Sequence, residues 1–222
     1  MKMIDQSVRI LYPDSADEGL KAMRRIEYAG RNCYRTQDKI TSDSYIGFTE
    51  RLAQRGHTAP LEFADVMIEI TTSRDVMAEI TRHRHASFCI QSQRYVTENK
   101  TGDIFFIKPL FYIPKDGDKT DAKRWCASRE WEAAMSDAEK AYAFLKHDCS
   151  MPSEDARKVL PNSTATVIVM KCNVRELLHI LNLRSSSAAY PEMREMIRLL
   201  EEQLEQIMPH VLRLKELVAN EG

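Results

Sequence analysis

The side chains best suited to ligand binding or catalysis lie in one stretch, Arg82 to Tyr95, which reads RHRHASFCIQSQRY. It holds three arginines, two histidines and two serines, and no acidic residue lies between Ile80 and Thr97. A guanidinium stays charged at any working pH and offers five donors in a planar fork that matches phosphate and carboxylate groups. Interleaved apolar residues indicate partial burial, where an unpaired charge is costly. The pattern favours a site for an anionic ligand such as a nucleotide over a solvated basic loop.

Other sequence features narrow the kind of site. The seven glycines form neither G-x-G-x-x-G nor a P-loop, so side-chain donors would have to replace the usual phosphate cradle of a dinucleotide site. Ser92 has no G-x-S-x-G context and no paired base, so we expect it to bind a ligand rather than to act as a nucleophile. His83 and His85 alone do not make a zinc site, and no metal is expected.

The composition excludes several classes of protein. The 222 residues, 43% of them hydrophobic, are enough for one sizeable core. A net charge of −1 argues against a general nucleic-acid binder, because such domains are usually clearly basic. The chain has no apolar run of about 18 residues and no signal-peptide pattern, so no membrane span is expected. Five scattered cysteines without C-x-x-C fit a reducing compartment and predict a cytoplasmic location.

Hydrophobic periodicity predicts the elements that position the candidate residues. Strands are expected at residues 7–12, 63–72, 104–111 and 164–171. Helices are expected at 17–32, 42–55, 75–82, 121–147, 153–160, 173–184 and 191–218. The last helix has an apolar seam, interrupted at Pro209, that would serve either core packing or an oligomer interface. The prediction is a single α+β (mixed α/β) domain over residues 1–222, with a central, mostly antiparallel sheet flanked by helices and a long C-terminal helix.

The spacing Arg-His-Arg, seven residues, Ser, one residue, Arg resembles the signature of the flavin-dependent thymidylate synthases. Four further segments resemble the same family: AGRNCY from Ala29, HTAPLE from His57, ARKVLP from Ala156, and the Asn-x-Arg that begins at Asn173. The resemblance covers roughly residues 29–194. It implies reductive methylation of dUMP to dTMP, with methylenetetrahydrofolate as carbon donor, FAD as cofactor and NADPH as reductant. It also implies a homotetramer with shared active sites.

The resemblance implies roles for the matching residues as well. Arg82 and Arg184 would be catalytic, because they would stabilise the negative charge that develops on the uracil. The dUMP site would comprise Glu79, Arg82, Gln91, Ser92, Gln93, Arg94, Arg184 and, from a neighbouring subunit, Arg157. The FAD site would comprise Cys33, His57, Ala59, Glu62, Arg82, His83, Arg84, His85, Asn173, Arg175 and His179. For Glu79, a surface pair with Arg82 is an equally good interpretation.

Alternatives stay open at this point. The segment Phe88–Gln91 has no acid where many relatives carry a glutamate, so C5 methylation or hydroxymethylation of UMP or dCMP is a second candidate. Many relatives also carry asparagine where this chain has His179. A non-catalytic nucleotide- or RNA-binding protein is a candidate from another class, disfavoured by the net charge and by the lack of aromatic-rich strand motifs. A flavin-independent hydrolase using Ser87 or Ser92 is weaker still.

Overall fold

The computed structural model describes residues 1–94 and 104–219, so Tyr95, the last residue of the arginine-rich stretch, lies outside the described residues. Contacts divide the chain into two compact units. Unit 1 comprises Met1–Gln6, Thr71–Ile80 and Ile90–Ile168, and unit 2 comprises Ser7–Ile70, Thr81–Cys89 and Val169–Gly222. The organisation of residues 1–222 as a single domain stays a prediction.

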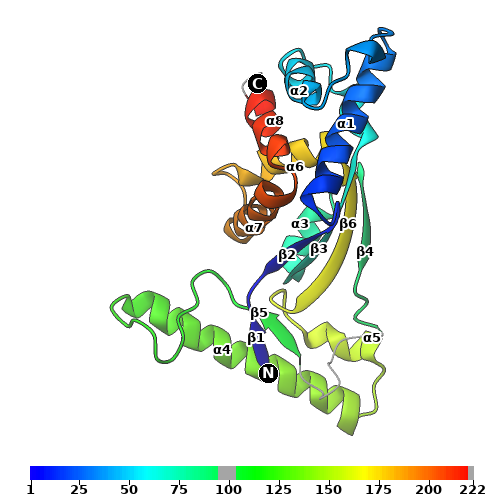
Figure 1. Ribbon diagram of the computed structural model, residues 1–222. Helices are drawn as coiled ribbons and strands as arrows, with labels where there is room; N and C mark the ends of the chain where they lie inside the picture. The colour runs from blue at the N-terminus through cyan, green and yellow to red at the C-terminus, as the bar shows by residue number, and fades with distance from the viewer. Residues whose placement is uncertain (95–103, 220–222) are drawn as a thin grey trace. The chain divides into compact units, whose positions relative to one another are not determined.

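Four strands form one sheet in the order β2–β3–β6–β4 (Figure 1). They are β2 (Ser7–Tyr12), β3 (Asp65–Ser73), β6 (Ala165–Asn173) and β4 (Ala86–Ile90). Backbone N–H groups donate from Val174 to the Ala64 carbonyl at 2.9 Å and from Arg74 to the Asn162 carbonyl at 2.8 Å, so β3 and β6 run antiparallel. Both strands alternate buried and less buried residues, as a period of two demands. The predicted α+β class and three of the four predicted strands are confirmed.

A second, smaller sheet lies in unit 1, where β1 (Lys2–Ile4) pairs in parallel with β5 (Phe105–Ile107). The predicted strand at 104–111 was therefore too long. Pro109 cannot donate to a ladder, and its carbonyl instead accepts from the Tyr112 N–H at 2.9 Å in a turn. The strand ends before this proline for that reason.

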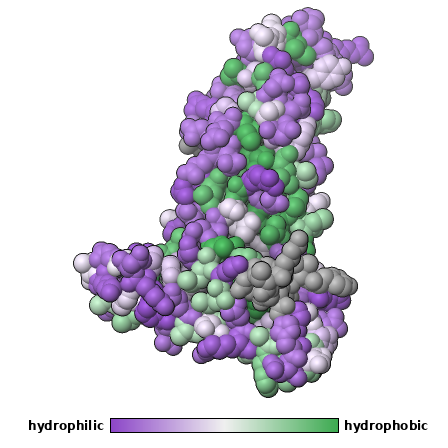
Figure 2. Space-filling model, turned by 60° about the horizontal axis from the view of Figure 1, so that its bottom comes forward, coloured by the Kyte–Doolittle hydropathy of each residue, from purple (hydrophilic) through white to green (hydrophobic). Residues whose placement is uncertain are grey.

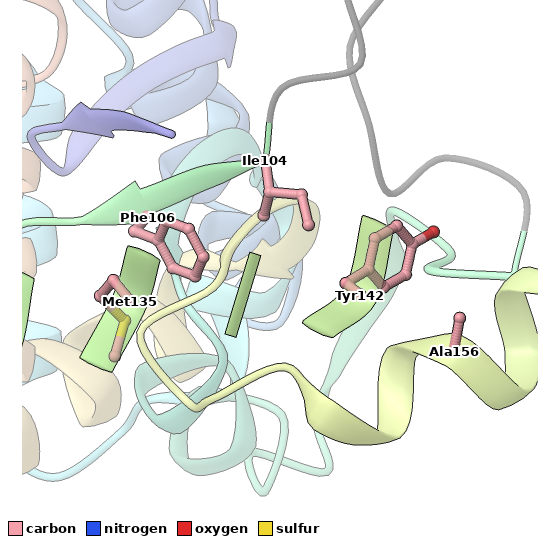
Figure 3. Packing of buried hydrophobic residues seen from close by; sticks show 5 residues of the cluster. All are labelled: Ile104, Phe106, Met135, Tyr142 and Ala156. Atoms are coloured by element: carbon pink, nitrogen blue, oxygen red, sulfur yellow. The ribbon is translucent and has the colours of Figure 1, made fainter. Parts of the chain in front are cut away.

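The core of unit 1 is built between β5 and the long helix α4 (Ala122–Ala143), as Figure 3 shows. Asp121 begins α4 by accepting the Arg124 N–H at 3.0 Å. Met135 and Tyr142, seven residues apart on one face of α4, are buried with Phe106 and Ile104. Ala156 of the short helix α5 (Ser153–Ala156) joins the same cluster, and a 3-10 turn, Arg157–Val159, follows it. Met135 and Tyr142 are thus among the α4 residues that pack into this core.

Unit 2 holds the helices α1 (Ala16–Asn32), α2 (Ser44–Gln54), α6 (Val174–Ser185), α7 (Pro191–Ile207) and α8 (Pro209–Ala219). Glu27 and Arg31 form a buried pair on α1, with Arg31 Nε 2.7 Å from Glu27 Oε1. The single C-terminal helix expected over 191–218 is two helices, because Pro209 lacks the N–H that would continue α7. Six seam residues are at most 1% exposed within unit 2, so the seam packs in the core: Met193, Ile197, Leu200, Leu204, Val211 and Leu214.

The helix predicted over 75–82 is α3 (Arg74–Ile80), which ends two residues earlier than expected. Residues 81–85 consequently form turns and open backbone before β4 begins at Ala86. This places the Arg-His-Arg segment on a short connection in unit 2. Its side chains take different environments, since His83 is buried while Arg82 and Arg84 are exposed.

Candidate functional site

The junction of β6 and α6 positions one side of the site. Asn173 ends the strand, and its side-chain oxygen accepts the backbone N–H of Glu176 at 2.9 Å, which caps α6. Asparagine is among the residues preferred at this capping position. The first turns of α6 then present Arg175, Glu176 and His179, the last two sharing a face at three-residue spacing.

Replacing Asn173 by alanine is expected to cost about 1 kcal/mol of unfolding free energy, because the Glu176 N–H loses its acceptor. Asn173→Asp keeps an acceptor oxygen and serves as the matched control, with stability close to that of the parent. Urea unfolding of the two variants checks the prediction. Equal stability of Asn173→Ala and Asn173→Asp would contradict the capping role.

A buried polar cluster forms around His83, which is 6% exposed. Its Nδ1 lies 3.1 Å from Oε1 of Glu176, and Arg184 Nε donates to its Nε2 at 3.0 Å. The His179 ring meets it edge-on, with centroids 5.7 Å apart. Burial lowers the pKa of His83, and the charge of Arg184 lowers that pKa further, against the opposing hydrogen bond to Glu176. The structure thus joins His83 and Arg184, which the resemblance assigned to different ligands, through contacts that the sequence did not indicate.

A cavity of about 540 Å³ opens beside this cluster in unit 2. Its volume falls within the range of about 300–1,000 Å³ common for small-molecule sites. Six residues line it: Glu62, His85, Asn173, Arg175, Glu176 and His179. Five of the six were predicted to hold the flavin, and Glu176 was missed because it resembles an ordinary acidic residue in the first turn of a helix.

The lining of this cavity suits the polar edge of a flavin, which presents carbonyl acceptors and a ring N–H donor. Arg175 supplies donors, and its Nη1 lies 2.6 Å from Oε1 of Glu62, so both groups are preset at the rim. Both side chains are about half exposed, at 53% and 46%. The side-chain oxygen of Asn173 accepts a hydrogen bond in the cap, and its amide N–H groups can donate to a ligand. The residues present therefore fit the cofactor that the sequence suggests.

Other predicted flavin residues lie elsewhere in unit 2. Cys33 is exposed immediately after α1, with Sγ 3.9 Å from the Ala29 carbonyl oxygen. His57 and Ala59 are exposed in the segment that joins α2 to β3. Arg82 and Arg84 are exposed beside the buried His83. Within the described part of the chain, none of these five residues lines the cavity.

A second cavity, of about 260 Å³, lies in unit 1 and includes two residues predicted for the nucleotide, Gln91 and Gln93. The Gln91 N–H donates to the Val167 carbonyl at 2.8 Å, which anchors the end of β4 against β6. Thr166 also lines the cavity and is 2% exposed, and its hydroxyl has no hydrogen-bond partner among the residues described. A buried hydroxyl without a partner costs about 1–3 kcal/mol, so a polar ligand suits this cavity. Thr166 lies in the strand predicted over residues 164–171, where no local pattern distinguishes it as a ligand-binding residue.

Four further nucleotide candidates, Ser92, Arg94, Glu79 and Arg157, also lie in unit 1, whereas Arg82 and Arg184 belong to unit 2. Ser92 Oγ accepts the Arg94 N–H at 3.3 Å, so the serine organises its own turn. Glu79 is half-buried near the end of α3. Arg157 is half-buried, and its Nε donates to the Glu154 carbonyl at 3.3 Å.

Sequence reasoning missed a further cation in unit 1, Arg74. Within the described residues its Nη1 is buried without a hydrogen-bond partner. Burial lowers the pKa of Arg74, and the nearby charge of Arg157 lowers that pKa further. Two guanidinium groups that repel one another make this region suited to an anion, which would relieve the repulsion.

Two further features are absent from the described residues. No group of three or more His, Cys, Asp or Glu in this part of the chain is arranged to hold a metal ion. No helix among the described residues is both long and apolar enough to cross a membrane. Figure 2 shows hydrophilic residues over much of the displayed face, with hydrophobic residues gathered along its middle.

The chain is similar to known proteins over most of its length. The family model described as thymidylate synthase complementing protein matches residues 17–210. The chain is 35% identical over 185 residues to the flavin-dependent thymidylate synthase of Geobacter sulfurreducens, covering 78% of this chain and 75% of that protein. It is 33% identical over 193 residues to the "Probable flavin-dependent thymidylate synthase" of Mycobacterium phage D29, covering 83% and 79%.

A solved structure shares the fold. The UMP/dUMP methylase PolB from Streptomyces cacaoi, bound with 5-Br dUMP, aligns with a TM-score of 0.76 over 96% of each chain at 22% sequence identity. The family model spans most of the chain, and both relatives exceed 30% identity over at least three quarters of their own length. This chain therefore belongs to the flavin-dependent thymidylate synthase family, whose members are FAD-dependent enzymes.

Proposed function

We propose that the enzyme converts dUMP to dTMP by reductive methylation at C5, with methylenetetrahydrofolate as carbon donor, FAD as cofactor and NADPH as reductant. The observation that carries the proposal is the cavity of unit 2, where five residues matching the family's flavin site come together beside Arg184's buried partner, His83. The relatives' shared activity supports the reaction class.

Residues of the unit 2 cavity would hold the cofactor. Arg175 and the Asn173 amide would donate to its carbonyl and phosphate oxygens, and Glu62 would accept from its N–H or hydroxyl groups. His85 and His179 complete the wall. When bound, FAD supplies the hydride that completes the methyl group. The residues of the chain would orient the flavin and form hydrogen bonds with the polar edge of its ring.

The nucleotide would be held by a different set of residues. Gln91, Ser92, Gln93 and Arg94 would contact its sugar and phosphate, and Arg157 would reach the phosphate from a neighbouring subunit of a homotetramer. Arg82 and Arg184 would face the uracil, which gains negative charge as C5 becomes nucleophilic. Donors preset for that developing charge usually supply the largest part of catalysis.

The second candidate substrate is UMP, with dCMP as a further test compound. Gln91, a neutral residue, lines the unit 1 cavity, and the segment Phe88–Gln91 supplies no acid to read the ribose or base. PolB, which shares the fold, is a UMP/dUMP methylase, and this supports testing both nucleotides. Turnover of dUMP, UMP and dCMP under identical conditions separates these candidates.

The experiment that tests the function is the visible spectrum of the purified full-length protein with added FAD. Flavin absorbance near about 450 nm should bleach with NADPH and return only when dUMP and methylenetetrahydrofolate are both present. A reduced flavin that reoxidises with UMP or dCMP instead would favour the second candidate. Failure to bind FAD, together with binding of RNA, would overturn the proposal and favour a non-catalytic RNA-binding protein.

The phosphate assignment makes a separate prediction at Arg157. Arg157→Gln should raise the Kd for dUMP by about tenfold or more, since a charge-assisted hydrogen bond is worth about 1.5–3 kcal/mol. Binding of deoxyuridine, which has no phosphate, should not change. Lys158→Gln is the control, because Lys158 is exposed and pairs with Asp155. Calorimetric titration checks the result, and an equal loss of affinity for deoxyuridine would rule out a phosphate contact.

Shared active sites can be tested by mixing subunits. Arg157→Gln and Arg184→Gln proteins, assayed at a dUMP concentration below the raised Kd of Arg157→Gln, should each have low activity. Unfolded together and refolded, they should regain part of the activity if the two residues act on one nucleotide from different subunits. A mixture as inactive as either parent would show that one subunit supplies both groups.

A further inference from the structure

The three groups Glu176, His83 and Arg184 form a chain of hydrogen bonds whose direction is set by chemistry. The guanidinium of arginine has donors and no acceptor, so the contact of Arg184 Nε at 3.0 Å requires His83 Nε2 to accept. A neutral imidazole has one donor and one acceptor. The proton of His83 therefore resides on Nδ1, which donates to Oε1 of Glu176 at 3.1 Å. The carboxylate fixes the tautomer, and the tautomer creates the acceptor for Arg184.

This arrangement exists only while His83 is neutral. A proton on Nε2 would point at the Nε–H of Arg184, and two positive charges would face each other in a buried region. The charged or titratable groups that face His83 are Glu176, His179 and Arg184, all on α6, and Arg82 and Arg84 flank it in its own turn. Burial and Arg184 both lower the pKa of His83, which favours the neutral form that the geometry requires.

We propose that His83 and Glu176 are positioning residues for Arg184: the carboxylate sets the histidine tautomer, and Nε2 of the histidine orients the guanidinium that faces the substrate. The inference rests on the proposed function in one respect, the role of Arg184 toward the uracil. Both ring nitrogens of His83 are bonded to other residues of the chain, so His83 would position Arg184 and would not contact the flavin through those atoms. Glu176 acts one step further away, as the group that orients the histidine.

The first test reads the tautomer directly in the full-length protein without ligands. Nitrogen-15 NMR of the histidine rings should show His83 Nε2 without a proton at pH 8, with titration only below pH 6.5. In Glu176→Gln, the amide oxygen still accepts from Nδ1 and the negative charge is lost, so the pKa of His83 should fall further. A proton on Nε2 at pH 8, or titration above pH 6.5, would overturn the proposal.

The second test separates positioning from packing with two histidine substitutions. A glutamine amide reaches the position of Nε2, so His83→Gln should keep an acceptor for Arg184, whereas the shorter His83→Asn places its amide near Nδ1. The expected result is that kcat falls about 10–100-fold in His83→Asn, the usual size of such indirect effects, and much less in His83→Gln. In the parent protein, kcat should fall at acidic pH as His83 gains a proton and can no longer accept from Arg184. His83→Gln has no titratable ring, so its kcat should not show this fall. An equal decrease of kcat in both variants, at unchanged melting temperature, would mean that His83 contributes packing alone and does not position Arg184.

The outcomes distinguish this inference from the proposed function. If the NMR result is as expected and no pyrimidine nucleotide turns over, the proposed function fails and the hydrogen-bond order stands. If dUMP turns over and His83 carries its proton on Nε2, the positioning role fails and the proposed function stands. If a variant does not fold, the NMR measurement of the His83 tautomer in the parent protein still decides whether the positioning role stands.

Discussion

Arg184→Gln is expected to lower kcat by about 10²–10³-fold with little change in stability, because the uracil loses the charge that would stabilise its transition state. Glutamine retains donors but has neither the positive charge nor the planar fork. Since the effect arises mainly in the transition state, the KM for dUMP should change much less than kcat. Arg184→Lys restores the charge without the Nε donor that contacts His83, so it should recover only part of the rate.

The control for this prediction is Arg198→Gln on α7, since Arg198 is half exposed and pairs with Glu195 and Glu202. Single-turnover reoxidation of the reduced enzyme with saturating dUMP and methylenetetrahydrofolate measures the chemical step. If Arg184→Gln and Arg198→Gln reacted at the same rate, Arg184 would have no catalytic role, and the function proposed for the His83 cluster would fail with it.

Gly19→Ala is expected to destabilise unit 2 by about 2–4 kcal/mol. A Cβ at this position would lie 2.1 Å from the Ile207 carbonyl oxygen and 2.9 Å from Cγ of Met208. The nearer atom belongs to the backbone where α7 ends, so it cannot swing aside, and α1 and α7 would have to separate. The gain in helix propensity from glycine to alanine, about 1 kcal/mol, offsets only part of this cost.

Gly47→Ala provides the matched control, because it is also a glycine inside a helix of unit 2. Its Cβ would meet only the end of a flexible side chain, Nη1 of Arg51 at 3.2 Å. This variant should be as stable as the parent or more stable. The measurement is thermal melting of the parent, Gly19→Ala and Gly47→Ala proteins. All three are compared at the same protein concentration and the same cofactor loading, since binding and assembly also shift apparent stability. A melting temperature for Gly19→Ala at or above that of Gly47→Ala would contradict the close approach of α1 and α7.

Local patterns in the sequence determined most of the elements and part of the site. The alternation in β3, the run of β-branched residues in β6 and the spacing in α1 and α7 predicted strands and helices correctly, because each pattern is typical of one type of element. The cap at Asn173 was also predictable, since a capping side chain bonds to the backbone only three residues away. Prediction failed where a single residue ended an element, as at Pro109.

Only the tertiary structure decided which chemical groups meet. His83 contacts Glu176 and Arg184, which lie 93 and 101 residues further along the chain, and no local pattern encodes contacts at that separation. The same is true of the pairing of Arg175 with Glu62, 113 residues apart. Burial of Thr166 and of the α7 seam likewise depends on what packs against them. The sequence determined the type and order of the chemical groups, and folding determined the partner, tautomer and charge environment of each, because these depend on distances through space.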